Sequence, residues 1–312
     1  MRFAFTEDQT LLADGLAAVA QRHWTREHLA QFWAGDWSVD DGLAAALGEA
    51  GVLGLCVSDE HGGLGQSMLD LAPSLEVAGH HALPDWVNRH LLASALLGGQ
   101  SELATQAALG RLIIGVQIDE ERIPHGPRLD HLLALKTDRV ELLGDCDFEP
   151  CETVDLGRPL YALKSAQRQV LAKGQRAEEL YWLAKTNRVL ADSLQLLGIA
   201  QAALDLAVEY VKERHQFGKA VGAQQAVKHL LANALISVEF ARPMVQRAAY
   251  ACHYQDSDCD GRVSGGWLMT SEAARQVERA TLQVHGAMGY SYEYHLHHLL
   301  KRSWALRHAN GE

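Results

Sequence analysis

Residues 190–218 read LADSLQLLGIAQAALDLAVEYVKERHQFG, and this stretch decides the fold class. Its large apolar residues recur at helical spacing, at Leu190, Leu194, Leu197, Leu204, Val208 and Val211. Such spacing places one apolar stripe along a helix of about six turns. The helix is predicted to end near Arg214 and Gly218, because a cation suits the negative C-terminus and glycine suits the turn that follows.

The rest of the C-terminal part repeats this pattern. A second apolar stripe runs along residues 227–252 and is interrupted only by Pro243. Further helices are predicted from Trp267 to Val284 and from Tyr292 to His308. Long helices with short connections pack as antiparallel bundles. Residues 175–312 are therefore predicted to form a C-terminal four-helix bundle.

The N-terminal part of the chain also has helical patterns. Thr6-Glu7-Asp8-Gln9 matches a capping box, with Thr6 at the N-cap and Gln9 three residues later. Residues 37–51 have the pattern of a short helix that ends at glycine. Residues 1–110 are therefore predicted to form an N-terminal helical domain.

Residues 111–174 change in character. Short apolar or alternating runs at residues 112–118, 132–135 and 139–143 are separated by Asp, Gly and Pro. This pattern is typical of strands and turns. A reduced middle β domain of a few short strands is expected. The predicted fold class is mainly α, with helical, β and helical segments in that order.

Composition narrows the range of functions. The chain has 312 residues, 48% of them hydrophobic and 21% charged, with a formal net charge of −11. Nucleic-acid-binding proteins rely on basic patches, so that class is not expected. The five cysteines form no CxxC pair, which favours reduced thiols and a cytoplasmic protein. No apolar signal core opens the chain, and no uninterrupted apolar run of about 18 residues predicts a membrane span.

Two clusters of metal-binding residue types occur, and neither predicts a metal site. Cysteine, histidine and aspartate gather at residues 252–260, and histidines gather at residues 295–298. Neither spacing fits a standard zinc pattern. A solvated loop between two helices and a structural surface helix are the favoured interpretations.

Two short motifs carry the chemistry. The first is Glu213-Arg214-His215-Gln216-Phe217-Gly218, and the second is Gln283-Val284-His285-Gly286-Ala287-Met288-Gly289-Tyr290. Helix ends alone would account for Arg214 and the glycines, but they would not account for Gln216-Phe217 or for Gln225. An arginine fork suits a pyrophosphate because it donates two hydrogen bonds, and glycine lets the backbone come close to a ligand.

These motifs resemble the Arg-x-x-Phe-Gly and Gln-x-x-Gly-x-x-Gly-Tyr/Phe turns of the acyl-CoA dehydrogenase family, which reach across a subunit interface to the partner's FAD. Residues 53–65 also resemble that family's N-terminal domain, with Ser58 and Asp59 where Pro and Glu are usual. The resemblance covers roughly residues 1–100 and 185–308. It implies FAD as the cofactor, with contacts from Arg214, Gln216, Phe217, Gln225, Gln283, Gly286 and Ala287.

The chain departs from the family where the chemistry takes place. The family removes the α-proton of the thioester with a glutamate, and the matching residue here is Asn310, or Arg188 at the alternative position. Neither side chain serves as a base. The middle domain lacks the TE-x-x-x-GSD and NGxKxxxxN patterns that cover the flavin, and Ala287 replaces a usual glycine. No catalytic residue is therefore predicted in this chain.

The departures imply a shortened subunit of a heteromeric bacterial acyl-CoA dehydrogenase. Some members of the family are α2β2 heterotetramers of two related chains that act in lipid and steroid degradation. By this analogy, a related full-length subunit supplies the catalytic glutamate and binds most of the acyl-CoA. Two alternatives remain: a self-sufficient homomeric dehydrogenase whose base is Glu293 or Glu312, and a non-catalytic scaffold with a decayed site.

Overall fold

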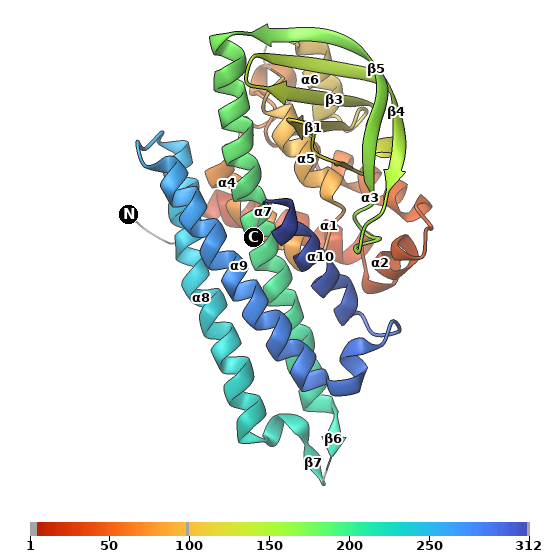
Figure 1. Cartoon of the computed structure of the whole chain (residues 1–312), viewed down its shortest axis with the longest axis vertical. Coiled ribbons are helices and arrows are strands. Elements are labelled where there is room, and N and C mark those ends of the chain that lie inside the picture. The colour runs from red at the N-terminus through yellow and green to blue at the C-terminus, as the bar shows by residue number, and fades with distance from the viewer. Residues whose placement is uncertain (1–4, 98–99, 217, 311–312) are drawn as a thin grey trace. The chain divides into compact units, whose positions relative to one another are not determined.

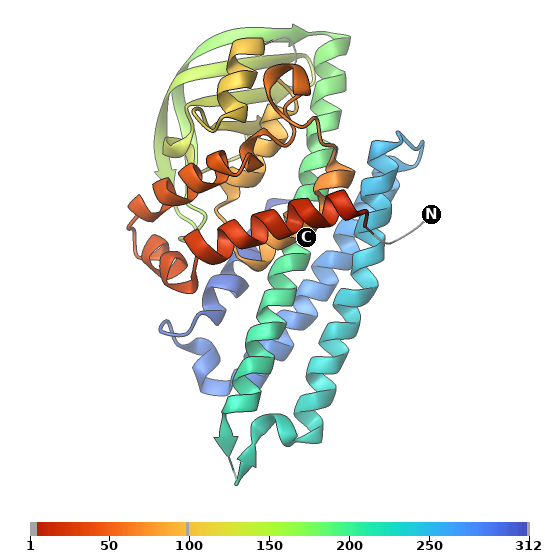
Figure 2. The same ribbon diagram turned by 180° about the vertical axis from the view of Figure 1, so that it is seen from behind.

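The computed structural model describes residues 5–97, 100–216 and 218–310 (Figures 1 and 2). The chain divides into two compact units. The bundle unit comprises Met1–Ala13, Ala72–Ala82 and Val189–Glu312, and the sheet unit comprises Asp14–Leu71 and Leu83–Arg188.

Helices form the N-terminal part, as predicted. They are α1 (Glu7–His23), α2 (Arg26–Trp33), α3 (Ser38–Glu49), α4 (Met68–His80), α5 (Asp85–Ser94) and α6 (Ser101–Ala108), with short 3-10 turns at Val52–Gly54 (η1) and Asp59–His61 (η2). The capping box is confirmed, because Thr6 N donates to Gln9 Oε1 at 3.0 Å and Gln9 N donates to Thr6 Oγ1 at 3.2 Å. The predicted glycine stop after α3 is confirmed too, with Gly51 at φ 72°.

The middle segment forms one five-stranded sheet in the order β1-β3-β4-β5-β2. Its strands are β1 (Ile114–Ile118), β2 (Ile123–Pro124), β3 (His131–Lys136), β4 (Arg139–Cys151) and β5 (Leu160–Lys173). β1 and β3 are parallel, and all other pairs are antiparallel. The expectation of only short strands is wrong for β4 and β5, which have 13 and 14 residues. They pair with each other over most of their length, with bulges that shift the register.

His90 of α5 joins the N-terminal helices to the sheet. Its Nδ1 accepts a hydrogen bond from Ile114 N at 3.1 Å, so its Nε2 carries the proton and donates to Leu53 O at 3.2 Å. Burial lowers the pKa of His90 to about 4. A neutral imidazole with one donor and one acceptor satisfies both backbone groups.

Four helices form the C-terminal part: α7 (Gln175–Glu213), α8 (Gln225–His253), α9 (Cys259–His285) and α10 (Leu296–Ala309). The predicted apolar stripe of α7 is buried, with Leu190, Leu194 and Leu197 at most 1% exposed. α9 begins at Cys259, before the predicted start at Trp267. Gly266 packs closely against Val245 of α8, so tertiary packing overrides the low helix propensity of glycine here.

Helix α7 is long and apolar enough to cross a membrane by length and composition alone. Most of its apolar stretch is buried inside the structure. A helix in the core of a bundle can have the same length and apolar composition. Because α7 is mostly buried, we interpret it as such a core helix.

α4 and α7 approach each other closely within the bundle unit. A Cβ atom on Gly198 of α7 would overlap Glu76 O, and a Cβ atom on Gly79 of α4 would overlap Gln195 O. Both obstacles are backbone atoms, which cannot turn aside as a side chain can. Glycine at these two positions therefore sets the distance between the helices.

Replacing Gly198 with alanine is expected to lower the free energy of unfolding by about 1–3 kcal/mol, because the added methyl forces α4 and α7 apart. Denaturant unfolding followed by circular dichroism measures the change. Gly265→Ala is the matched control, since its Cβ meets nothing within 4 Å and helical alanine should stabilise. Equal stability of the two variants would contradict the close packing.

Candidate functional site

The first motif directly follows α7. Arg214 N donates a hydrogen bond to Tyr210 O at 2.9 Å, which closes the last turn of the helix. β6 (His215–Gln216) and β7 (Lys219–Ala220) then pair as a short antiparallel hairpin. Gly218 has φ 78°, a left-handed conformation that glycine adopts without strain. The described residues of this motif therefore lie between the end of α7 and the short hairpin.

The second motif forms the end of α9. The helix stops at His285, and Gly286 takes φ 56° and ψ −130°, a backbone conformation that only glycine adopts readily. A 3-10 turn, η5 (Gly286–Tyr290), follows. Gly286 and Ala287 are both exposed, so this turn presents its backbone to solvent.

The two motifs lie at the same end of the bundle (Figures 1 and 2). The rings of Tyr210 in α7 and His285 in α9 stack with centroids 4.4 Å apart, and Tyr210 Oη donates to His285 O at 3.4 Å. α8 also begins here, at Gln225, and Val221 N in the connection donates to Arg214 O at 2.8 Å. The fold therefore brings together segments that are far apart in the sequence.

A buried hydrogen-bond chain supports the second motif. His285 Nδ1 donates to Thr281 O at 2.7 Å, so its Nε2 accepts from Tyr294 Oη at 3.2 Å. Burial lowers the pKa of His285, which favours this neutral form. The chain fixes the end of α9 just before the Gly286 turn. No local sequence pattern indicates this role for His285 or Tyr294.

The described side chains that the sequence predicts to contact FAD face solvent. Arg214, Gln216, Gln225, Gln283, Gly286 and Ala287 are all exposed, and Phe217 lies outside the described residues. The Arg214 guanidinium and the carboxamide NH₂ groups of the glutamines can donate hydrogen bonds to phosphate oxygens. The carboxamide oxygens can accept hydrogen bonds from hydroxyl groups. The set suits a dinucleotide that is held by another surface, and its role as a contact set stays a prediction.

A groove of about 430 Å³ lies beside the first motif, between α7 and α8. Its walls are mostly apolar, and Lys212 and Lys228 add two cations to its lining. No sequence pattern links these two lysines, because they belong to separate helices with no shared motif. Only the packing of α7 against the start of α8 brings them to one groove.

Asn310, at the family's base position, is engaged in a structural contact. Its Nδ2 donates to Asp192 Oδ2 of α7 at 2.8 Å, and Asp192 is 1% exposed. Asn310 is the C-cap residue of α10, and its side-chain amide holds that helix to α7. Asp192 was not identified from the sequence, since nothing in its local pattern separates it from other polar residues on the helix.

Arg188, at the alternative base position, forms an ion pair with Glu121. The neighbouring acidic residues are similarly engaged, because Asp119 accepts a hydrogen bond from Tyr181 Oη at 2.8 Å and Glu120 pairs with Lys136 at 3.0 Å. This acidic turn, which stands where the family starts its flavin-covering loop, instead holds the first turns of α7 to the sheet.

The histidine run after the second motif lies at the start of α10. His297 and His298 lie with ring centroids 3.9 Å apart, and burial lowers the pKa of His298 to about 3. Within the described ranges, no group of three or more His, Cys, Asp or Glu side chains is placed to hold a metal ion.

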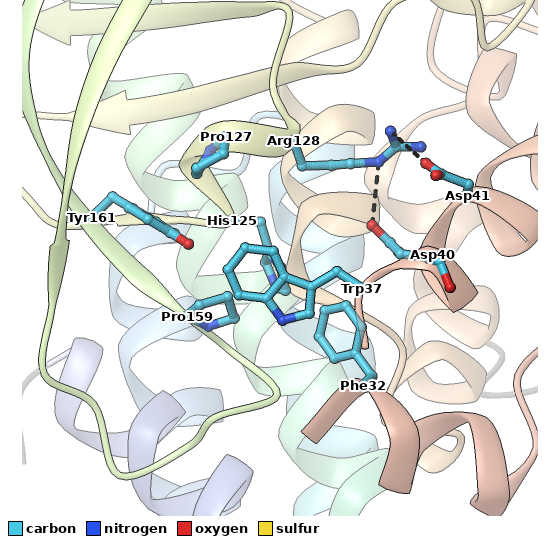
Figure 3. A pocket seen from close by; sticks show the side chains of 10 residues that line it. Phe32, Trp37, Asp40, Asp41, His125, Pro127, Arg128, Pro159 and Tyr161 are labelled. Carbon is cyan, nitrogen blue, oxygen red and sulfur yellow. Dashed lines mark ion pairs between the residues drawn. The ribbon is translucent and has the colours of Figure 1, made fainter. Parts of the chain in front are cut away.

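The sheet unit contains a cavity of about 320 Å³ that no sequence motif predicted (Figure 3). Apolar and aromatic side chains make up most of its lining, and they are Phe32, Trp37, His125, Pro127, Pro159 and Tyr161. Arg128 lies at one side, where it pairs with Asp40 and Asp41 at 3.2 Å each. Figure 3 shows these carboxylates turned toward the arginine.

Asp40 also lines this cavity and is buried. Its Oδ1 accepts a hydrogen bond from Trp86 Nε1 at 2.7 Å, and Arg128 lies over the Trp86 ring at 5.5 Å. Burial raises the pKa of Asp40 from 3.8 to about 6, against the lowering effects of Trp86 and Arg128. The effect of desolvation on the pKa of Asp40 is therefore larger than the opposing effect of the ion pair with Arg128.

This pKa predicts how stability depends on pH. A raised folded-state pKa means that protonation of Asp40 favours folding, so the contribution is complete below about pH 4 and is lost as the pH rises through about 6. Asp40→Asn cannot ionise and should remove a pH dependence of up to about 3 kcal/mol. Unfolding in urea at each pH measures it. Asp41→Asn, with a side chain that is 75% exposed, should behave as the wild type.

Comparison with known proteins gives the family. The N-terminal domain of acyl-CoA dehydrogenases matches residues 6–97, and the C-terminal domain matches residues 187–312. The chain is 27% identical to the acyl-CoA dehydrogenase IpdE2 of Mycobacterium tuberculosis, over 95% of this chain and 91% of IpdE2. It is 32% identical to the acyl-CoA dehydrogenase FadE34 of the same organism, over 83% of this chain but only 38% of FadE34.

Solved structures share the fold. A chain of the ChsE4-ChsE5 complex from Mycobacterium tuberculosis superposes with a TM-score of 0.86 at 24% identity, over 100% of this chain and 96% of that chain. A chain of the steroid acyl-CoA dehydrogenase Tcur3481-Tcur3483 gives 0.85 at 23% identity, over 96% and 92%. With both terminal domains matched and the helical, β and helical order observed, the chain belongs to the FAD-dependent acyl-CoA dehydrogenase family.

Proposed function

We propose that this chain is the short subunit of a heteromeric acyl-CoA dehydrogenase that forms an α,β-double bond in a CoA thioester. The chain contributes one wall of an FAD site at the subunit interface. A related full-length subunit supplies the catalytic glutamate, the cover over the flavin and most of the acyl-CoA site. The complex is proposed to work in the cytoplasm.

One observation carries this proposal. The cofactor motifs are gathered and exposed at one end of the bundle, whereas both family base positions hold residues occupied elsewhere. A self-sufficient enzyme needs both a cofactor surface and a base. Among the described residues, the cofactor surface is present at its family position, whereas no base stands at either family position.

The exposed residues fit the cofactor. Arg214 would pair with the pyrophosphate of FAD, and Gln216, Phe217 and Gln225 would flank it. Gln283, Gly286 and Ala287 would receive the other end of the molecule, with backbone approach allowed at the glycine turn. When bound, FAD accepts the hydride that leaves the β-carbon of the thioester. The side chains of this subunit bind and orient, and they move no proton.

The proposed partner and the proposed substrate class are inferred from related proteins. ChsE4-ChsE5 is a complex of two chains, and Tcur3481-Tcur3483 is a steroid acyl-CoA dehydrogenase. By analogy, the partner of this chain is a longer homologue, the assembly is a heterotetramer, and the acyl group derives from a steroid.

Expression with and without the partner tests the proposal. The chain alone should be colourless, because its FAD residues form an open surface with no flavin cover. Exposed apolar side chains on α8, such as Phe240 at 66%, should also make it prone to aggregate. Co-expression with an adjacent-gene homologue should give a yellow complex with one FAD for each pair of chains. One tightly bound FAD on each protomer of the isolated chain would contradict the proposal.

A further inference from the structure

The turn between α8 and α9 holds two cysteines. Cys252 is the next-to-last residue of α8, and Cys259 is the first residue of α9. Their Sγ atoms are 3.0 Å apart. α8 begins and α9 ends beside the cofactor motifs, so this turn lies at the opposite end of both helices (Figure 1). The pair is thus separate from the proposed FAD surface.

The connection between the two cysteines is held in one conformation. Asp256 N donates to Ala251 O at 2.9 Å, and Cys259 N donates to Asp256 O at 2.9 Å. The Asp256 carboxylate pairs with Arg247 of α8 at 2.5 Å. These bonds fix the start of α9 against the end of α8, so the short thiol contact results from a built turn and not from two free side chains.

Both thiols of the pair are partly buried. Burial, together with Cys259 and Asp260, raises the pKa of Cys252, which slows any reaction that begins at this sulfur. The thiolate is the attacking form of cysteine. The two Sγ atoms lie 3.0 Å apart, so each sulfur is placed to resolve a sulfenic acid that forms on the other.

We propose that Cys252 and Cys259 are an oxidation-sensitive pair that a hydroperoxide converts into an intramolecular disulfide. The Cys259 thiolate attacks the terminal oxygen of the hydroperoxide, the O–O bond breaks, and a sulfenic acid and one water or alcohol result. The Cys252 sulfur then attacks the Cys259 sulfur, its proton leaves with the hydroxyl group as water, and the S–S bond forms. Two thiols are oxidised and one peroxide bond is reduced.

The disulfide would tie α8 to α9 at the turn. A covalent link across this short segment restricts the unfolded chain and opposes separation of the two helices. The other three cysteines, Cys56, Cys146 and Cys151, lie in the sheet unit, and each is a free thiol.

Treatment of the full-length chain with hydrogen peroxide, followed by mass spectrometry of the intact protein and of its peptides, tests this inference. The intact mass should fall by two hydrogen atoms, and the peptides that carry Cys252 and Cys259 should appear linked. Dithiothreitol should reverse both changes. Cys151→Ser is the matched control, because it removes a partly exposed thiol on β4 and should leave the linkage intact.

Single variants test the order of the steps. Cys252→Ser should trap a sulfenic acid at Cys259 that dimedone labels, and Cys259→Ser should give several-fold less label at Cys252. The inference is overturned if Cys252 and Cys259 both remain open to alkylation after peroxide has oxidised Cys151. It is also overturned if equal labelling of the two single variants accompanies an unlinked wild type.

Discussion

Arg214→Ala is expected to strip FAD from the assembled complex. A bidentate pyrophosphate contact at an interface contributes about 2–4 kcal/mol, so affinity should fall by roughly 30- to 1,000-fold. Gel filtration with detection at flavin and protein wavelengths measures the FAD that stays bound. Arg214→Lys should lie between wild type and alanine, since an ammonium keeps the charge and loses the fork.

The control for Arg214 is Arg262→Ala at the other end of the α8–α9 hairpin. Arg262 pairs with Asp258 at 2.9 Å, and its loss changes the net charge of the chain by the same amount. This variant should retain full flavin content. If Arg214→Ala retains it as well, then Arg214 only ends α7, and the exposed motif does not bind the cofactor.

Substitution of the carboxylates near the C-terminus is expected to leave turnover within a few-fold of wild type. Glu293 is exposed on the loop before α10, where its backbone N donates to Ser291 Oγ at 3.2 Å. Glu293→Gln, Glu312→Gln and deletion of residues 311–312, which leaves the contact of Asn310 with Asp192 in place, should therefore retain activity in the complex. Loss of a true general base costs on the order of 10²–10⁴ in rate. Steady-state assays with an artificial electron acceptor separate the two outcomes.

The partner provides the comparison for this prediction. Replacing its catalytic glutamate with glutamine should abolish flavin reduction while FAD remains bound. A hundredfold loss in Glu293→Gln or Glu312→Gln, with FAD and assembly unchanged, would place the base in this subunit. That result would favour the self-sufficient enzyme over the heteromeric one.

These two predictions are independent of each other. Arg214 tests whether the exposed motif end binds FAD, and the carboxylate variants test where the α-proton goes. A non-catalytic scaffold with a decayed site would pass the second test and fail the first. A homomeric dehydrogenase would pass the first and fail the second. Only the proposed short subunit passes both.

The sequence by itself determined the features that depend on neighbours within about one helical turn. The capping box at Thr6 and Gln9, the glycine stop after α3 and the buried stripe of α7 all follow from such spacing. The two motifs that are predicted to contact FAD were visible for the same reason, because each lies within eight consecutive residues. Asn310 and Arg188 at the positions matched to the family's base were visible as well, since a residue type is read without a fold.

Only the tertiary structure decided which distant residues meet. Tyr210 stacks on His285, Asn310 binds Asp192, and Cys252 lies beside Cys259 because helix packing sets those distances. Likewise, α9 extends over Gly266, which local propensity disfavours, since close contact with α8 offsets its cost. Side-chain identity along the chain carries local preferences, but the contacts between helices depend on the summed packing of the whole bundle.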